Sequence, residues 1–454
     1  MNIISEDIEC AKLIAKKVHE IGGNVYYVGG YVRDKIMNIE NKDIDIEVHG
    51  ITPKQLEEIL DSIGKRIEIG ESFGIYNLKG FSIDIAMPRK ENAIGGGHKD
   101  FDILVDPNMG TYNASKRRDF TINALMENVL TGEIVDHFNG ILDIKNKIIR
   151  HVNDETFKDD PLRVLRGAQF ASRFGFNICN ETINISKNMD ISKLSKERIE
   201  NELKKVLLKS NKPSIFFDIM NKTNHLDYWF KEIKQLIGIK QNPIYHPEGD
   251  VYTHTMMVLD EGVNFREKVS EPYYFMLSCL VHDLGKITCT KEINGVIRAI
   301  GHEIEGISIV KEFIKRITNE KKVCDYICNI TKLHMKPNML AKEKSSIKAT
   351  NKMFDQAIDK EALIYISICD SKKDYGYNRD NKDFLFERLN IYNEYMSRDY
   401  VVGKDLIDNG LIPNEHFKDI LLYAHNLRLS GVDKESALKQ TLSYAKIHNK
   451  KVIQ

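Results

Sequence analysis

Residues 26–48 read YYVGGYVRDKIMNIENKDIDIEV, in which a buried strand, a short helix and a second strand follow one another. Asp43 and Asp45 lie two residues apart in the second strand, so their side chains point to the same face. Two carboxylates held that close favour a cation between them, and Mg²⁺ takes carboxylate oxygens while leaving positions for substrate phosphates. Upstream, Gly29 and Gly30 let the backbone approach a phosphate closely, and Arg33 can neutralise a triphosphate. The pattern predicts a site for metal-assisted transfer of a nucleotidyl group.

The composition excludes some classes of protein. The 454 residues suggest two to four domains, and 66 basic residues balance 66 acidic ones, so any basic surface for a nucleic acid must be local. No run of 18 apolar residues is present, and the first ten residues lack the features of a secretion signal. Seven cysteines, an odd number in a long chain, are typical of reduced thiols. We expect a cytoplasmic protein that does not cross a membrane.

The first 150 residues mix helix and strand patterns. An apolar stripe predicts a helix over 5–21 that Gly22 and Gly23 end. Thr52 begins a second helix through a capping box with Gln55. Further strands are expected at 25–28, 43–48, 75–78 and 81–87, and the turn-rich residues 91–113 are expected to form a mobile loop or lid, or a plain surface connection.

Beyond residue 150 the 3.6-residue periodicity of helices dominates. We therefore expect an α+β fold, with a small mixed sheet and its helices at the N-terminus followed by an all-α middle and an all-α C-terminal half. The predicted domains are 1–150, a catalytic head; 151–238, a helical neck; 239–385, a second helical domain; and 386–454, a helical tail.

Two further segments of the first half are rich in charged groups. In RRDFTIN, residues 117–123, Arg118 is available for a phosphate and Asp119 for a ribose hydroxyl or a helix N-cap. The alternative is a capped helix with solvated arginines.

The other segment is DDPLRVLRGAQFASRFGF, residues 159–176, in which Asp160 and Pro161 mark the start of a helix. Arg163 and Arg166 follow three residues apart on one face. A carboxylate and an arginine together can offer an acceptor and donors to the edge of a base. Arginines at this spacing also occur on solvated or ion-paired faces.

The four motifs GGYVRD, KDIDIEV, RRDFTINAL and DDPLRVLRGAQFASRFGF, in this order, resemble the class II tRNA nucleotidyltransferases, which comprise CCA-adding enzymes and bacterial poly(A) polymerases. The resemblance covers roughly residues 20–210 and implies a nucleotidyltransferase-type head with a neck that selects the nucleotide and binds RNA. By this resemblance, Asp43 and Asp45 hold the catalytic Mg²⁺. The nucleotide-binding positions it implies are Gly29, Gly30, Arg33, Arg118, Asp119, Asp160, Arg163 and Arg166.

Within that set the resemblance assigns distinct roles. Gly30 and Arg33 contact the triphosphate, and Arg118 precedes the aspartate of the ribose-discriminating motif. Asp160 and Arg163 match the amino-acid template that pairs with the incoming CTP or ATP.

The chain departs from the family pattern at three places. Asp159 replaces the usual glutamate before Asp160, and Gln169 stands where many members carry an arginine. Asp84, on a neighbouring strand, is a candidate third catalytic carboxylate, but we favour a strand-end aspartate in an ion pair.

A second cluster of metal-ligand residue types lies in the C-terminal half. HDLGK follows the apolar run FMLSCLV and resembles the HD phosphohydrolase domain. The resemblance implies metal ligands at His254, His282, Asp283 and Asp370, with His302 and His334 matching the extra histidines of two-metal members. Imidazole and carboxylate ligands suit Mn²⁺, Ni²⁺, Co²⁺ or Fe. The alternative is a helical scaffold that has lost its metal.

The expected function is template-independent, Mg²⁺-dependent transfer of CMP and AMP from CTP and ATP to the 3′ end of tRNA, with a phosphohydrolase activity in the HD domain. Within the same class, a CC-adding enzyme, an A-adding enzyme or a poly(A) polymerase would carry the same motifs. An alternative of another class is a metal-dependent HD phosphohydrolase whose head binds RNA. The expected partners are tRNA, CTP and ATP, and the sequence leaves the oligomeric state open.

Overall fold

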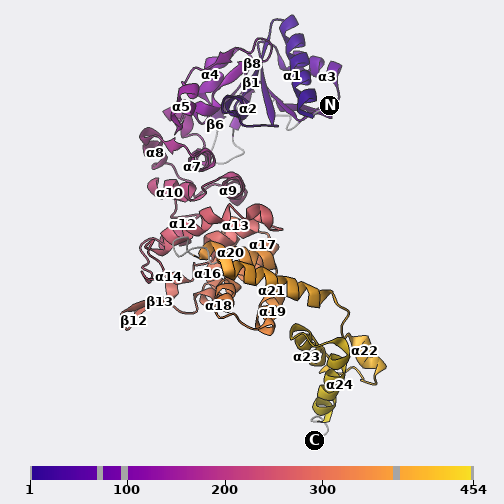
Figure 1. The fold of residues 1–454 in the computed structure, drawn as a ribbon. Coiled ribbons are helices and arrows are strands. Elements are labelled where there is room, and N and C mark those ends of the chain that lie inside the picture. The colour runs from indigo at the N-terminus through magenta and orange to yellow at the C-terminus, as the bar shows by residue number, and fades with distance from the viewer. Residues whose placement is uncertain (1–2, 69–74, 94–100, 372–378, 451–454) are drawn as a thin grey trace. The chain divides into compact units, whose positions relative to one another are not determined.

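The computed structural model describes residues 3–68, 75–93, 101–371 and 379–450 (Figure 1). The chain divides into two compact units. One comprises Met1–Glu202 with Ile215–His225, and the other comprises Leu203–Ser214 with Leu226–Gln454. This division is coarser than the four domains expected from the sequence, which stay a prediction.

A mixed seven-stranded sheet forms the centre of the first unit, in the order β3-β4-β5-β2-β1-β8-β9. Its strands are β1 (Asn24–Val28), β2 (Ile44–His49), β3 (Arg66–Glu68), β4 (Ile75–Leu78), β5 (Ile83–Ala86), β8 (Met126–Asn128) and β9 (Ile134–Val135). β2 pairs with β1 antiparallel and with β5 parallel, so it lies in the middle of the sheet. The α+β fold expected from the sequence is confirmed.

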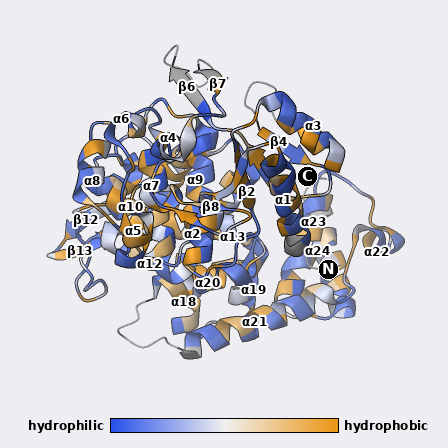
Figure 2. Ribbon diagram, turned by 90° about the horizontal axis from the view of Figure 1, so that it is seen from above, coloured by the Kyte–Doolittle hydropathy of each residue, from blue (hydrophilic) through white to orange (hydrophobic). Residues whose placement is uncertain are grey.

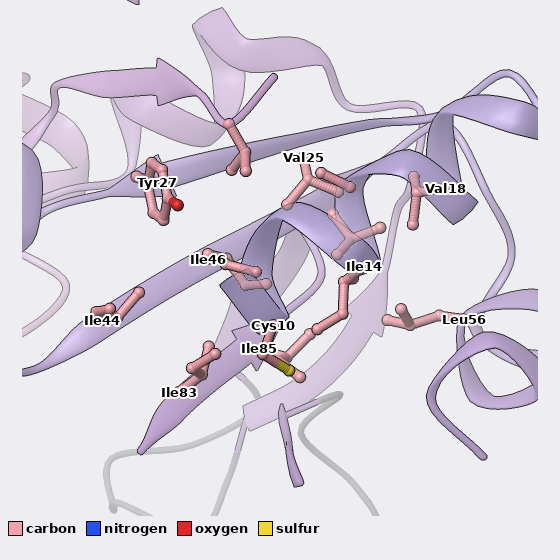
Figure 3. Packing of buried hydrophobic residues seen from close by; sticks show 14 of the residues in the cluster. Cys10, Ile14, Val18, Val25, Tyr27, Ile44, Ile46, Leu56, Ile83 and Ile85 are labelled. Atoms are coloured by element: carbon pink, nitrogen blue, oxygen red, sulfur yellow. The ribbon is translucent and has the colours of Figure 1, made fainter. Parts of the chain in front are cut away.

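The core of this sheet forms where β1 and β2 face two helices, α1 (Ile3–Glu20) and α3 (Pro53–Ile63). Figure 3 shows Ile14 and Val18 of α1 against Val25 of β1, with Ile46 of β2 close by. The expected capping box of α3 is confirmed, since Thr52 Oγ1 accepts from the Gln55 backbone N–H and the Gln55 side chain bonds back to Thr52. The apolar stripe that predicts α1 and the capping box that predicts α3 therefore agree with the way these helices pack on the sheet.

The expectation of a loop over residues 91–113 is wrong in large part. Residues 89–105 contribute an antiparallel strand pair, β6 (Arg89–Ala93) and β7 (Phe101–Val105), and α4 (Gly110–Lys116) follows. Residues 94–100, with the three glycines, lie outside the described residues. The backbone ladder of β6 and β7 arises without the alternation of apolar and polar residues by which a strand is recognised in a sequence.

The rest of the first unit, up to the change of unit near residue 203, is mostly helical. After η1 (Thr121–Asn123) come α5 (Gly140–Asn146), β10 (Ile148–Ile149), α6 (Asp154–Phe157), α7 (Leu162–Phe174), β11 (Asn177–Ile178), α8 (Asn180–Ser186), α9 (Lys196–Lys209) and α10 (Ser214–Lys222). α7 is buried on most of its surface, so its few polar side chains are held in defined places.

The second unit is a helical assembly with one small hairpin. Its elements are α11 (Lys231–Gln235), α12 (Val251–Gly262), η2 (Arg266–Lys268), α13 (Pro272–Val281), α14 (Lys286–Cys289), β12 (Thr290–Ile293), β13 (Val296–Ala299), α15 (His302–Glu305), α16 (Ile307–Ile317), α17 (Lys321–Leu333), α18 (Met335–Lys342), α19 (Ile347–Gln356), α20 (Lys360–Asp370), α21 (Arg379–Ser397), α22 (Gly403–Asp408), α23 (Phe417–Leu429) and α24 (Lys434–Lys450). Figure 2 shows hydrophilic and hydrophobic residues alternating along α21, as expected of an amphipathic helix. Among the described residues, no helix has both the length and the apolar character that crossing a bilayer requires.

Replacing Ile46 by alanine tests how far the central strand supports the sheet. Ile46 is fully buried, and its loss should cost about 2–5 kcal/mol because the cavity cannot close. Amides of β1 and β2 should therefore exchange hydrogen faster in native-state exchange measurements. Ile67→Ala on β3, where the side chain is 45% exposed, serves as the control and should leave these rates nearly unchanged. Equal effects of the two variants would contradict this account of the core.

Candidate functional sites

The acidic side chains of the first site follow one face of β2. Ile44, Ile46 and Val48 are buried in the core on the other face of the strand. The alternation of side chains therefore directs Asp45 and Glu47 away from the core, and Asp43 precedes them by the same two-residue step. Asp43 lies one residue before the start of β2, so a shared face for the two expected metal ligands stays a prediction, although the charge of Asp43 acts on Asp45.

A third carboxylate meets this row from the neighbouring strand. The parallel pairing of β2 and β5 places Asp84 directly opposite Asp45. Burial raises the pKa of Asp45 to about 6, and the negative charges of Asp84 and Asp43 add to the effect while Arg118 opposes it. No ion pair of Asp84 occurs within the described part of the chain. The geometry therefore favours a shared acidic site over the strand-end ion pair that the sequence analysis preferred.

The turn between β1 and α2 (Gly30–Ile36) approaches the same row. Gly29 has a φ of 63°, a left-handed conformation that favours glycine, and a Cβ added there would lie 3.0 Å from Arg118 Nη1. Arg118 Nη2 also donates to Glu47 Oε2 at 3.3 Å. Burial opposes ionisation of Glu47, but His49 and Arg118 hold the pKa of Glu47 below its usual value. The structure thus brings the glycine turn, Arg118 and the carboxylates together.

Arg33, expected to contact a triphosphate, is buried and only 4% exposed. Its Nε donates to Asp34 Oδ1 at 2.7 Å, and its Nη1 donates to Asn123 Oδ1 at 2.6 Å. The guanidinium also lies 4.7 Å from the centre of the Phe174 ring. In this structure Arg33 connects α2 to η1 and α7, and its guanidinium is not presented to an open phosphate site.

Asp119 is also buried, and it binds Arg166. Arg166 Nε donates to Asp119 Oδ2 at 2.7 Å, and Asn123 Nδ2 donates to Asp119 Oδ1 at 3.0 Å. Asp119 raises the pKa of Arg166. The N-cap alternative for Asp119 is wrong, because η1 starts from Phe120 without a side-chain cap. A ribose contact of Asp119 stays a prediction.

The residues expected to read the base lie at the start of α7. Asp160 Oδ2 accepts from Arg198 Nη2 at 2.8 Å, and the Asp160 side chain is 34% exposed. Arg163 donates to the backbone carbonyls of Thr156 and Arg117, each at 2.7 Å. The two side chains therefore do not pair with each other; each is held by a separate partner at the same helix end.

Several residues of this site were not predicted from the sequence. Glu47 could have been found, because it continues the row of carboxylates by one more two-residue step. Arg198 gives no local signal, since it lies 38 residues from Asp160. Asn123 was part of a quoted motif but was assigned no role. Partners of this kind come together only through the folding of the chain.

The second site lies within the second unit, where α12, α13 and α20 pack side by side (Figure 1). Three groups of side chains there have atoms close enough to hold metal ions, and two of them consist of residues expected from the sequence. The first group is His254, His282, Asp283 and Asp370, and the second is Asp283, His302 and His334. The structure thus brings together all six residues that the resemblance to the HD domain implies.

Asp283 belongs to both groups through different oxygens. Its Oδ2 lies 3.3 Å from His282 Nε2 and 3.7 Å from His254 Nε2. Its Oδ1 lies 3.2 Å from His302 Nε2 and 3.8 Å from His334 Nε2. Atoms bound at roughly 2.1 Å to one metal stand about 3 to 3.5 Å apart in a tetrahedral site. The distances to His282 and His302 lie in this range, and those to His254 and His334 are slightly longer.

The histidines of both groups are oriented from outside the cluster. Nδ1 of His254 lies 2.8 Å from Glu248 Oε1. The Nδ1 atoms of the other three histidines lie 2.6–3.0 Å from backbone carbonyl oxygens: His282 from that of Cys279, His302 from that of Ala299 and His334 from that of Thr331. Because such oxygens accept, Nδ1 carries the proton and Nε2 remains for a metal. His282 Nε2 and Asp283 Oδ2 are buried and lie 3.3 Å apart, and Lys286 Nζ lies 2.7 Å from the same carboxylate oxygen. Imidazole and carboxylate atoms buried this close together fit a metal centre.

A close backbone approach keeps the cluster compact. A Cβ added at Gly285 would collide with the carbonyl of His302. The glycine therefore lets the turn after His282 and Asp283 pass directly against α15.

Comparisons with known proteins agree with this division of sites. The poly A polymerase head domain matches residues 25–150, the probable RNA and SrmB-binding site of polymerase A matches residues 175–237, and the HD domain matches residues 251–371. The multifunctional CCA protein of Psychromonas ingrahamii is 32% identical over 317 residues, which are 68% of this chain and 74% of the relative. That of Pasteurella multocida is 30% identical over 401 residues, which are 85% and 92% of the two chains.

Solved structures show the same fold. The CCA-adding enzyme of Thermotoga maritima, solved in complex with a tRNA, has a TM-score of 0.66 at 21% identity and covers 97% of each chain. The CCA-adding enzyme of Bacillus stearothermophilus, solved in complex with CTP, has a TM-score of 0.65 at 19% identity and covers 99% of this chain and 100% of that one.

The head with its shared carboxylates and the helical cluster of histidines define a nucleotidyltransferase that carries an HD domain. Both domain types imply dependence on divalent metal ions. Together with the relatives, these features show that the chain belongs to the family of multifunctional CCA proteins, which are CCA-adding tRNA nucleotidyltransferases.

The raised pKa of Asp45 gives a prediction for Mg²⁺ binding. Below about pH 6 a proton occupies the carboxyl group in the metal-free protein, so Mg²⁺ affinity should fall as the pH is lowered through that value. Asp84→Asn removes a like charge and should move the midpoint to lower pH. Calorimetric titrations with Mg²⁺ between about pH 5 and 8 measure both effects. Asp61→Asn, at an exposed site on α3, is the control, and an unmoved midpoint in Asp84→Asn would refute the interaction.

The HD cluster gives a second prediction. Burial opposes protonation of His282, but Asp283 and Asp370 raise the pKa of His282 to about 10, so the metal-free imidazole is protonated at neutral pH. A metal ligand must be neutral, and binding of Mn²⁺ near pH 7 should release protons. The number of protons released is obtained by measuring the heat of Mn²⁺ binding in two buffers of different ionisation enthalpy. A heat of binding that is independent of the buffer would contradict this prediction.

Proposed function

We propose that this chain transfers CMP and AMP from CTP and ATP to the 3′ end of tRNA without a nucleic-acid template. The observation that carries the proposal is the acidic row on β2 beside the turn at Gly29, with Arg118 between them. Membership in the family and relatives solved with tRNA, ATP and CTP support the same substrates. The seven cysteines are all free thiols, which supports a reducing compartment such as the cytoplasm as the place of action.

In the proposed reaction, a bond forms between the 3′ oxygen of tRNA and the α-phosphorus of the nucleotide. The bond from that phosphorus to the β-phosphate bridging oxygen breaks, pyrophosphate leaves, and the 3′ hydroxyl loses its proton. Asp43 and Asp45 would hold Mg²⁺, with Asp84 as a candidate third carboxylate; the ion, when bound, stabilises charge on the reacting phosphate. Arg118 and the Gly29 backbone would bind the triphosphate.

Selection of the base is proposed for the start of α7. Asp160 is partly exposed and offers carboxylate oxygens, and Arg163 is fixed by the backbone carbonyls of Thr156 and Arg117. An acceptor and donors at one helix end can match the edge of cytosine or adenine. For Asp160 to accept a hydrogen bond from a base, its Oδ2 must either release Arg198 or accept from both groups at once.

The second proposed activity is hydrolysis of phosphoesters by the HD domain. The shared position of Asp283 between two donor groups favours it, because a pure scaffold gains nothing from burying so many metal-ligand side chains in one cluster. Mn²⁺, Ni²⁺, Co²⁺ or Fe suits these ligands, and such an ion supplies a hydroxide nucleophile or polarises a phosphoryl group. The substrates proposed by family resemblance are phosphodiesters and phosphomonoesters.

Extension of a tRNA that lacks its last three nucleotides tests the transferase. With CTP, ATP and Mg²⁺ the chain should add three residues, while Asp43→Ala and Asp45→Ala should each lower the rate by about 100-fold or more. Asp61→Ala is the matched control for loss of an acidic side chain. Product lengths on a sequencing gel separate full CCA addition from addition of CC, of A or of a poly(A) ladder.

The variant His282→Ala separates the two sites. It should extend tRNA at the normal rate, since His282 belongs to the HD cluster. Loss of all activity in His282→Ala, with no extension by the unaltered chain, would favour the phosphohydrolase with an RNA-binding head.

A further inference from the structure

A carboxylate and a histidine adjoin the HD cluster without belonging to either donor group described above. Glu248 Oε1 accepts from Nδ1 of His254 at 2.8 Å and from Nδ1 of His246 at 2.9 Å. The two imidazole rings meet edge to face, with their centres 4.8 Å apart. One carboxylate oxygen thus orients two histidines at once.

For His254 the consequence is a fixed ring. Its Nδ1 proton points to Glu248, and its Nε2 lies 2.9 Å from Asp370 Oδ1 inside the cluster. A carboxylate in this position sets the tautomer and the direction of a metal-binding imidazole. Glu248 is therefore placed to act on the metal through His254.

For His246 the consequence is different, because this side chain lines a cavity of about 690 Å³. Asp283, His302 and Asp370 of the metal cluster line the same cavity. Glu248 occupies Nδ1 of His246, so Nε2 is the polar ring atom left for a molecule in the cavity. His246 thus stands beside the metal cluster and faces the space where a substrate would bind.

Basic side chains that line the cavity indicate that the substrate carries a negatively charged group. Lys240, Lys286 and Arg298 line it, and Lys286 Nζ lies 2.7 Å from Asp283 Oδ2. Cations beside a metal cluster complement a phosphate group. Ile244 and Ile300, which also line the cavity, are 69% and 70% exposed and offer apolar surface to the rest of an ester.

A third metal centre is the alternative for these residues, since His246, Glu248 and His254 have atoms near one another. Such a centre would require Nδ1 of His254 to bind metal while its Nε2 faces the first donor group. With a metal in the first group as well, that demands loss of both ring protons. The hydrogen bonds from both histidines to one oxygen satisfy the three groups without it.

We propose that His246 contacts the phosphate of the substrate through Nε2, and that Glu248 is a positioning residue that holds both His246 and the metal ligand His254. The proposal rests on the phosphohydrolase function proposed above. It adds a substrate contact and a positioning group to that site.

Substitutions at position 246 can separate the two ring nitrogens. His246→Asn keeps an amide N–H near the place of Nδ1, so the bond to Glu248 can remain, but it removes Nε2. His246→Gln places its amide near the position of Nε2 instead. His416→Asn, at a half-exposed site in α23's N-terminal turn, is the matched control.

The measurements are calorimetric binding of Mn²⁺ to the full chain and binding of inorganic phosphate to the Mn²⁺-loaded chain. His246→Asn should bind Mn²⁺ like the unaltered chain and bind phosphate about 10-fold or more weakly, because a hydrogen bond to a charged group is lost. His246→Gln should recover part of the phosphate affinity. Glu248→Gln should weaken Mn²⁺ binding by about 10- to 100-fold, whereas Glu267→Gln, a highly exposed control, should not.

Unchanged phosphate binding in His246→Asn would overturn the substrate contact. Loss of Mn²⁺ binding in a folded His246→Asn protein would show a metal ligand instead, and unchanged Mn²⁺ binding in Glu248→Gln would overturn the positioning role. Hydrolysis of p-nitrophenyl phosphate and bis(p-nitrophenyl) phosphate is measured separately. If the unaltered chain hydrolyses neither, the phosphohydrolase proposal fails, and the two binding measurements still decide the roles of His246 and Glu248.

Discussion

The alternation of side chains along β2 is the constraint on which the transferase site depends. Every second residue is driven into the core against α1 and α3, and this burial fixes the register of the strand. The carboxylates of Asp45 and Glu47 must then face the other side, where the parallel neighbour β5 adds Asp84. A slip of one residue would bury the charges and expose the isoleucines. Packing of apolar side chains on one face of β2 therefore determines where the carboxylates lie on the other face.

Buried polar groups in the two sites are organised by different means. In the head, arginines are held by carboxylates and carbonyl groups, as in the pairs of Arg166 with Asp119 and of Arg198 with Asp160. In the HD domain, oxygens behind the ligands orient the histidines and direct their Nε2 atoms toward the carboxylates at the centre. The first arrangement pairs arginines with fixed acceptors, and the second gathers imidazole and carboxylate ligand atoms around positions that a cation can occupy.

The parts of this structure that were predictable from sequence are those with local signals. The strand expected at 43–48 and found at 44–49, the capping box at Thr52 and the mixed-sheet head followed by helices were predicted from periodicity and turn chemistry, while the grouping of HD residues was predicted from resemblance. The burial of Arg33 and the partner of Asp160 could not be predicted, because they depend on contacts between residues far apart in the chain. The strands β6 and β7 were missed because their sequence lacks alternation.

The two oxygens of Asp283 have a consequence for how the HD domain responds to its surroundings. One donor group has four residues and the other has three, and they share this carboxylate. The richer group should fill first when ions are scarce, and its occupancy then fixes the orientation of the bridging carboxylate for the poorer group. Filling of the pair should therefore be sequential, and the occupancy of the poorer group should depend on the concentration of free metal.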